Sequence, residues 1–285
     1  MFNNGNIGFL LKVSEKFLNF NGLPESKLDS EILLSFILQI KRFELYFVRN
    51  FNLTNEQISR FEKYIIRRSN REPLVYIMES SGFMGFEFKV NRNVFIPRFE
   101  TELLVDTVLK IAKTNKNNNA VLDLCTGSGC IAISLAKLGN FKNITASDIN
   151  NNVLEIAKKN VKINNVSNIN FIKSDIFSNM HDDKFDIIVS NPPYVSKFEY
   201  SFLDYELRYE PKLALLAQDN GLFFYKEIKN KALKHLNKNG SLLLELNANK
   251  SNIIKNMFMA DDNYKNIEIL NDYSGLPRIL KVNVK

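Results

Sequence analysis

The stretch Ala120-Val121-Leu122-Asp123-Leu124, followed by Cys125-Thr126-Gly127-Ser128-Gly129, decides the fold of this chain. Its first half predicts a short strand, its glycine-containing half a tight turn, and the apolar run from Ile131 to Leu138 a helix. Glycines let the backbone approach a ligand closely, and the free amides at a helix N-terminus point toward it. A strand, a glycine-rich turn and a helix in this order are typical of proteins that hold a nucleotide-like cofactor.

An acidic residue follows at an informative distance. The next predicted strand, residues 143–147, ends at Asp148, which lies 21 residues beyond Gly127 (148 − 127). An acid about 20 residues beyond such a turn commonly holds ribose hydroxyls. The turn alone is also compatible with an ordinary strand–helix connection. The turn and the acid together fit a dinucleotide or S-adenosylmethionine (SAM).

The segment Asn191-Pro192-Pro193-Tyr194 follows the apolar strand predicted at 185–190, at the edge of the sheet where ligands bind. The Asn191 amide oxygen is one hydrogen-bond acceptor, and Pro193 keeps Pro192 out of helical conformation, so the Pro192 carbonyl is a second. Two fixed acceptors suit both hydrogens of a planar –NH2 group, and Tyr194 offers a ring face beside it. The set favours methylation of a nitrogen conjugated to a π-system, and therefore SAM; the alternative is a structural Pro-Pro turn.

Strands and helices alternate through the rest of this region, which predicts an α/β fold with a mostly parallel, doubly wound, seven-stranded, Rossmann-like sheet. The last two strands have no helix between them and predict an antiparallel hairpin. The predicted strands are 120–124, 143–147, 169–173, 185–190, 241–246, 266–270 and 278–284. The predicted helices are 129–138, 151–164, 221–236 and 248–259.

The N-terminal part has a different pattern. Apolar residues recur at helical spacing over 7–18, over 29–40 and after Thr54, where Thr54-Asn55-Glu56-Gln57 has the form of a capping box. We interpret residues 1–80 as a small helical bundle that recognises the substrate; the alternative is a purely structural cap.

A linker and a catalytic domain follow the bundle. Alternating apolar residues over 81–96 predict a β-hairpin that turns near Asn91-Arg92-Asn93. Residues 97–285 then form the SAM-binding domain. Its first helix follows Pro97-Arg98-Phe99, with Glu100 or Thr101 as the expected cap.

Composition excludes several other classes of protein. The 285 residues are 45% hydrophobic and carry a net charge of +7, but many lysines lie among asparagines, as in 113–119, a run that indicates a solvated linker. We therefore expect no stable nucleic-acid partner. Two cysteines and two distant histidines suggest neither a disulfide framework nor a metal site. No apolar stretch approaches about 18 residues and the N-terminus lacks a signal-peptide pattern, so we expect a cytoplasmic protein without membrane contact.

These segments together resemble the HemK-type release factor glutamine methyltransferases, which are class I SAM-dependent methyltransferases. The resemblance extends over about residues 30–280. Besides the cofactor turn and Asn191–Tyr194, it is carried by Arg71-Glu72-Pro73-Leu74-Val75-Tyr76-Ile77, Phe95-Ile96-Pro97-Arg98-Phe99-Glu100-Thr101-Glu102 and Tyr209-Glu210-Pro211-Lys212-Leu213-Ala214-Leu215. It implies N5-methylation of the glutamine in the Gly-Gly-Gln motif of peptide chain release factors, which are then the protein partners, in support of translation termination.

The resemblance also implies a role for individual residues. Cys125, Thr126, Gly127, Ser128 and Gly129 are expected to hold the methionine part of SAM and Asp148 its ribose. Asp175, Ile176 and Phe177 are expected to flank the adenine. Asn191, which is also expected to contact SAM, binds the glutamine amide together with Pro192, Pro193 and Tyr194. Of these, Asn191, Pro192 and Tyr194 are the expected catalytic residues.

The sequence departs from the family pattern at three places. Cys125 stands where many members have glycine, Ile176 where some have an aromatic residue, and Leu216-Ala217-Gln218 where Phe-Gly-Gly is common. Two alternatives to the implied function remain open. One is an N-methyltransferase for exocyclic amines of DNA or RNA, since those amines are also planar and conjugated; the other is a non-catalytic protein-binding module on a methyltransferase fold.

Overall fold

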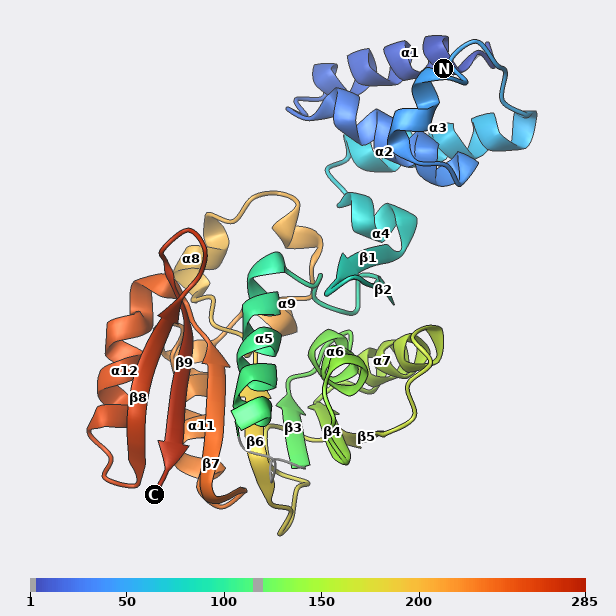
Figure 1. The fold of residues 1–285 in the computed structure, drawn as a ribbon. Helices are drawn as coiled ribbons and strands as arrows, with labels where there is room; N and C mark the ends of the chain where they lie inside the picture. Colours follow the sequence, from blue (N-terminus) through green and yellow to red (C-terminus); the bar gives the residue numbers. More distant parts are fainter. Residues whose placement is uncertain (1–3, 115–119) are drawn as a thin grey trace. The chain divides into compact units, whose positions relative to one another are not determined.

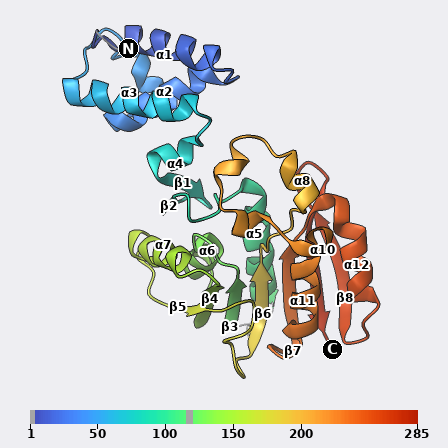
Figure 2. The same ribbon diagram turned by 180° about the vertical axis from the view of Figure 1, so that it is seen from behind.

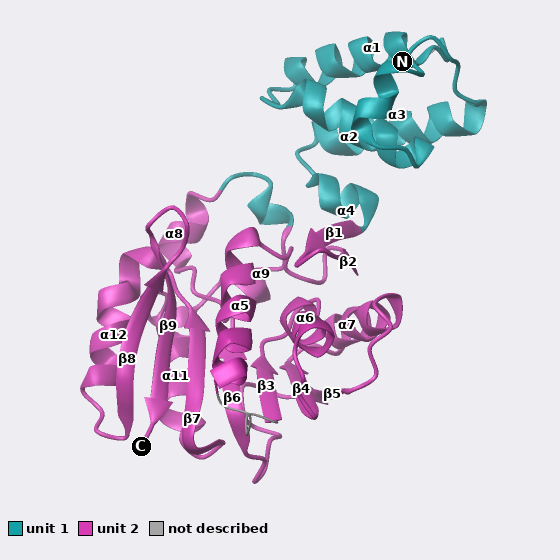
Figure 3. Ribbon diagram, viewed as in Figure 1, with its two compact units in different colours: residues 1–79, 204–209 teal, residues 80–203, 210–285 magenta. Residues whose placement is uncertain are grey.

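The computed structural model describes residues 4–114 and 120–285, and the predicted linker at 113–119 therefore lies almost entirely outside the described residues. The chain divides into two compact units (Figure 3). The helical unit consists of Met1–Glu79 and Asp204–Tyr209, and the sheet unit of Ser80–Leu203 and Glu210–Lys285. Each unit has its own hydrophobic core.

The helical unit forms where apolar residues recur at helical spacing. Thr54 caps its third long helix as the sequence predicts: its hydroxyl accepts from the Gln57 amide at 3.2 Å, and the Gln57 side chain accepts from the Thr54 amide at 2.9 Å. The core includes Leu10, Leu33 and Phe61, all fully buried. The helices are α1 (Ile7–Phe20), α2 (Ser26–Leu38), the 3-10 helix η1 (Arg42–Tyr46), α3 (Asn55–Ser69), α4 (Leu74–Met78) and the 3-10 helix η2 (Leu207–Tyr209).

Residues 204–209 complete this unit although they are distant in sequence. The buried Arg68 guanidinium donates to the Asp29 carboxylate at 2.7 Å and to the Glu206 carboxylate at 2.8 Å. The Tyr209 hydroxyl donates to the Asn70 carbonyl. A charge of this kind is tolerated inside a protein only when it is paired, and here both acids neutralise one arginine.

The sheet unit contains one seven-stranded sheet in the order β5-β4-β3-β6-β7-β9-β8 (Figures 1 and 2). The first five strands in this order are parallel, while β9 is antiparallel to both β7 and β8. This confirms the predicted fold class and the antiparallel hairpin at the end of the chain. The strands are β3 (Ala120–Leu124), β4 (Asn143–Asp148), β5 (Ile169–Lys173), β6 (Phe185–Ser190), β7 (Leu236–Glu245), β8 (Tyr264–Asn271) and β9 (Pro277–Val284).

Helices cover both faces of the sheet, because alternate strand residues point to opposite sides. Val121, Ile187 and Leu243 belong to the core under α5 and α6, whereas Leu122 and Ile188 belong to the core under α11 and α12. Figures 1 and 2 show these two layers from opposite sides. The helices are α5 (Phe99–Thr114), α6 (Cys130–Leu138), α7 (Asn151–Ile163), α8 (Lys197–Ser201), α9 (Lys212–Leu215), α10 (Gln218–Gly221), α11 (Phe223–Ala232), the 3-10 helix η3 (Ala248–Lys250) and α12 (Ser251–Met259).

Two local predictions need correction. The hairpin consists of β1 (Ser80–Phe83) and β2 (Phe86–Lys89), so it turns at Met84–Gly85 and not at 91–93. Both turn residues have positive φ, 52° and 77°, as a tight two-residue hairpin turn requires. Neither Glu100 nor Thr101 caps α5, because the helix begins at Phe99 and both residues lie inside its first turn.

Candidate active site

The carboxyl ends of four parallel strands meet at one edge of the sheet. Leu124 of β3 pairs with Ser147 of β4 and with Ser190 of β6, and Ser190 pairs with Leu244 of β7. The residues that follow these positions therefore lie side by side. They are the turn at 125–129, Asp148, Asn191 and Glu245. The register thus brings together the turn, the acid and the asparagine that the sequence singled out.

The turn at 125–129 is shaped by positive φ angles at Cys125 (60°), Gly127 (57°) and Gly129 (81°). Asp123 fixes it from below: its Oδ2 atom accepts from the Thr126 hydroxyl at 2.6 Å and from the Ala132 amide at 3.1 Å. The left-handed conformation at Cys125 gives a physical reason for glycine at this position in many members of the family that the chain resembles, since glycine adopts it without strain.

The turn and Asp148 have properties that fit a nucleoside cofactor such as SAM. A Cβ atom added to Gly127 would meet no atom within 4 Å, so its backbone is open to a ligand. The Asp148 carboxylate accepts hydrogen bonds from the backbone amides of Gly127, at 3.2 Å, and Asn150, at 3.1 Å. Burial raises the pKa of this carboxylate. Within the described part of the chain, the Ser128 and Ser147 hydroxyls are buried without a hydrogen-bond partner. Open backbone and unsatisfied polar groups together suit a ligand with many polar atoms.

The three residues expected at the adenine differ in exposure. Asp175 is exposed at the start of the turn that follows β5, whereas Ile176 and Phe177 are only 6% and 5% exposed. The Phe177 ring stacks on His235, with centroids 4.7 Å apart and planes inclined by 3°. One ring face is therefore occupied by protein. The adenine role of these residues stays a prediction.

The Asn191 side chain has a defined direction. Its Nδ2 atom donates to the Thr101 hydroxyl oxygen at 3.3 Å. Among residues 4–114 and 120–285, neither the Asn191 Oδ1 atom nor the Pro192 carbonyl oxygen accepts a hydrogen bond. Pro192 and Pro193 are buried, while Asn191 and Tyr194 are half-buried. Two oxygen acceptors are thus available at this edge of the sheet.

Thr101 and Glu245 complete this cluster and were not among the residues predicted from sequence. The Thr101 hydroxyl donates to the Glu245 Oε2 atom at 2.7 Å, and both residues are only 2% exposed. Burial raises the pKa of Glu245 to about 7. Burial, with the nearby Glu245 charge, also raises the pKa of the Tyr194 hydroxyl, which therefore stays neutral. The signal for Glu245 was an acid at the end of the apolar run Leu242-Leu243-Leu244.

The backbone beyond Tyr194 is held by a neighbouring segment. The Val195 amide donates to the Leu215 carbonyl, and the Ala217 amide to the Val195 carbonyl, both at 2.8 Å. Ala217 has an extended backbone and Gln218 has no positive φ angle, so neither of the two positions where glycine is common in the family requires it. The positive φ angles occur just beyond, at residues 219–221. The departure from the family pattern is therefore compatible with the local backbone.

An ion pair between Arg98 and Glu210 holds the segment that leads into α5. Arg98 binds the buried Glu210 carboxylate and stacks on Phe95, with the guanidinium 4.6 Å from the ring centroid. Glu210 also accepts from the Ile96 amide at 3.1 Å. These contacts join two segments that carry the family resemblance, and they fix the residues that lead into the helix bearing Thr101.

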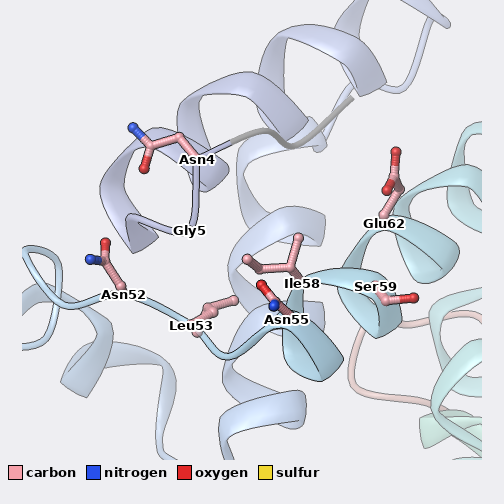
Figure 4. A pocket seen from close by; sticks show the side chains of 8 residues that line it. All are labelled: Asn4, Gly5, Asn52, Leu53, Asn55, Ile58, Ser59 and Glu62. Carbon is pink, nitrogen blue, oxygen red and sulfur yellow. The ribbon is translucent and has the colours of Figure 1, made fainter.

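A pocket of about 620 Å³ lies in the helical unit (Figure 4). It contains none of the residues predicted to bind SAM or the substrate amide. Its lining residues are Asn4, Gly5, Asn52, Leu53, Asn55, Ile58, Ser59 and Glu62. The described residues include no group of three or more His, Cys, Asp or Glu side chains that could hold a metal ion. In the same part of the chain, every helix is too short or too polar to cross a membrane.

Comparisons with known proteins identify the family. A model of the PrmC N-terminal domain matches residues 10–78, and a model of the methyltransferase small domain matches residues 97–203. The release factor glutamine methyltransferase of Leptospira interrogans is 38% identical, with 95% of this chain and 96% of that protein covered. The protein of the same name from Thermodesulfovibrio yellowstonii is 35% identical, with 88% and 90% covered.

Another relative and a solved structure are also similar to this chain. The ribosomal protein uL3 glutamine methyltransferase of Francisella tularensis is 41% identical, with 68% of this chain and 62% of that protein covered. A methyltransferase structure from Pyrococcus furiosus has a TM-score of 0.52 at 19% identity, with 81% and 99% covered, and supports the fold alone. With the near full-length relatives, these findings show that the chain belongs to the release factor glutamine methyltransferase family.

Proposed function

We propose that this protein transfers the methyl group of SAM to the side-chain amide nitrogen (N5) of the glutamine in the Gly-Gly-Gln motif of peptide chain release factors, in the cytoplasm. The observation that carries the proposal is the pair of oxygens at Asn191 and Pro192, which accept no hydrogen bond from the residues that the structure describes and lie beside the turn at 125–129 and Asp148. The names of the near full-length relatives support the same substrate.

The cofactor is proposed to lie along the strand ends. Residues 125–129 would hold its methionine part, Asp148 its ribose hydroxyls, and residues 175–177 its adenine. When bound, SAM supplies an electrophilic methyl group: the S–CH3 bond breaks as the N–CH3 bond forms, and one amide proton is released to water. The carboxylate of Asp148 is suited to its role because it accepts hydrogen bonds and can serve two hydroxyls at once.

The protein must make a weak nucleophile reactive, because the lone pair of an amide nitrogen is delocalised into its carbonyl group. The Asn191 and Pro192 oxygens would accept both N–H bonds of the substrate, which shifts electron density onto the nitrogen and fixes its π-face. The same oxygens stabilise the positive charge that develops on the nitrogen. Tyr194, neutral and half-buried, would pack against the planar amide. Orientation of the amide provides the remaining acceleration.

The helical unit is proposed to recognise the protein substrate. It has its own core, and the matched N-terminal domain model covers residues 10–78. None of the residues proposed for SAM or for the amide lies in it. Release factors are therefore the proposed partners, with no stable nucleic-acid or membrane partner.

A second substrate is suggested by one relative. The Francisella tularensis protein is named for glutamine methylation of ribosomal protein uL3, and a glutamine amide in another protein presents the same –NH2 group to Asn191 and Pro192. The match to the N-terminal domain model favours a release factor for this chain. Offering a release factor and uL3 to the enzyme as substrates in the same assay distinguishes these two candidates.

The decisive experiment incubates the protein and SAM with a release factor, with uL3 and with a DNA or RNA duplex, and locates added methyl groups by mass spectrometry. We expect a gain of one methyl group on the Gly-Gly-Gln glutamine of the release factor. Methylation of a nucleic acid alone, or of no substrate although SAM binds, would contradict the proposal. Asn191→Ala is expected to lower the single-turnover rate by about 10²–10³, by analogy with loss of one oxyanion-hole donor.

A further inference from the structure

We infer that Thr101 is a positioning residue: its hydroxyl, held by Glu245, orients the Asn191 amide so that the amide oxygen faces the substrate. This inference rests on the proposed function, because it concerns the group that grips the substrate nitrogen. It adds two residues, on α5 and β7, to the catalytic arrangement. Neither is proposed to touch the substrate or the cofactor.

The contacts form a chain of two hydrogen bonds. The Asn191 Nδ2 atom donates to the Thr101 Oγ1 atom at 3.3 Å, and Thr101 Oγ1 donates to the Glu245 Oε2 atom at 2.7 Å. Thr101 and Glu245 are each only 2% exposed, so water does not compete for the bond between them. The chain joins residues that are 90 and 144 positions apart in sequence.

The direction of the chain follows from the donors available. A hydroxyl group has one hydrogen and two lone pairs. When Glu245 is ionised and its carboxylate takes that hydrogen, only lone pairs of the Thr101 oxygen face Asn191. The amide –NH2 group is then preferred on the Thr101 side, and the amide oxygen is turned to the opposite side. Without this constraint, a rotation of 180° would present two donors to a substrate –NH2 group, which needs acceptors.

The framework that carries the chain is rigid. Thr101 lies in the first turn of α5, which packs on the sheet. The Glu245 main chain is fixed by the buried Tyr225 hydroxyl, which donates to its carbonyl oxygen at 2.9 Å. A donor and an acceptor held on separate packed elements keep the orientation of a third group more exactly than the flexible side chain of that group alone does.

The test compares Thr101→Val, which keeps the shape but removes the hydroxyl, with Thr101→Ser, which keeps the hydroxyl. The matched control is Thr107→Val: Thr107 is also buried on α5, but its hydroxyl donates only within the helix, to the Leu103 carbonyl at 2.7 Å. We expect Thr101→Val to lower kcat about tenfold, the equivalent of one hydrogen bond, with the Kd for SAM unchanged. Thr101→Ser should retain most of the rate, and Thr107→Val all of it.

A double-mutant comparison separates orientation of Asn191 from general support. The Asn191→Asp variant has no –NH2 group that could donate a hydrogen bond to the Thr101 hydroxyl oxygen. Adding Thr101→Val to Asn191→Asp should therefore change kcat by less than about twofold. A full tenfold loss in that background would overturn the inference, because the hydroxyl would then act independently of the Asn191 amide. So would a wild-type kcat in Thr101→Val alone.

Failure of the inference is distinguishable from failure of the proposed function. If the wild-type protein methylates no release factor, the proposed function is wrong, and neutron crystal structures of the wild type and Thr101→Val, in which the amide deuterons distinguish nitrogen from oxygen, still test the inference. We expect the Asn191 amide nitrogen to bind Thr101 in the wild type, and the amide to adopt two orientations in the variant. One unchanged orientation in both structures would overturn it.

Discussion

Replacing Glu245 with glutamine should make the stability of the protein less dependent on pH. Burial is the largest cause that raises the pKa of Glu245, from an ordinary 4.5 to about 7, and Glu100 adds to it; the Thr101 hydroxyl, Arg278 and Arg98 oppose it. The folded protein therefore binds this proton more tightly than the unfolded chain. The resulting stabilisation is complete below about pH 4.5 and is lost as the pH rises through about 7.

The magnitude follows from the shift. The difference between about 7 and 4.5, at about 1.4 kcal/mol per pH unit, corresponds to about 3 kcal/mol, most of it lost between about pH 5 and pH 8. Glutamine does not titrate, and its carbonyl oxygen can still accept from Thr101. Between about pH 5 and pH 8 the wild type should therefore lose about 2–3 kcal/mol more unfolding free energy than Glu245→Gln does.

The assay is urea unfolding at several pH values, followed by circular dichroism because the chain has no tryptophan. Burial also raises the pKa of Asp123 to about 7, but that residue is present in both proteins and cancels in the comparison. Glu155→Gln is the control, because Lys158 lowers the pKa of this exposed acid and it does not titrate in the range. A difference between the wild type and Glu245→Gln that is equal at both ends of the range would refute the reasoning.

Three further predictions concern the cofactor turn. Asp148→Ala should weaken SAM binding by about 1.5–3 kcal/mol in calorimetry, because a charged acceptor is lost; unchanged affinity would place the cofactor elsewhere. Cys125→Val should lower the free energy of unfolding by about 1–3 kcal/mol, whereas Cys125→Gly should be tolerated, because φ is 60° there; equal stability of the two variants would contradict this. Asn160→Ala should destabilise the protein by about 2–3 kcal/mol in urea unfolding, since its buried amide donates to the Ser128 and Lys89 carbonyls; a loss below about 0.5 kcal/mol would argue against it.

The sequence predicted most of the sheet because its signals are local. Apolar runs gave β3, β5 and β6 with their observed bounds, and the capping box at Thr54 gave the start of α3. The hairpin turn at Met84–Gly85 was missed because alternation of apolar residues continues past it through Val90 and Ile96, which are buried without forming a strand.

The candidate site was predictable only in part. The turn at 125–129, Asp148 and Asn191 each follow a strand that is visible in the sequence, so topology alone brings them together. The partnership of Thr101 with Glu245 joins positions 144 residues apart and depends on how α5 packs on β7. No local pattern encodes that packing, and Thr101 had instead suggested a helix cap.

The inclusion of residues 204–209 in the helical unit has a consequence for synthesis on the ribosome. Glu206 is made 138 residues after Arg68, which at about 5–20 residues per second is a delay of roughly 7–30 s. During this delay the nascent bundle has Asp29 as the acid that pairs with Arg68. The N-terminal unit therefore completes its fold only after much of the sheet has emerged, and a ribosome that stalls before residue 206 would carry a bundle in which the buried Arg68 lacks one of its two ion pairs.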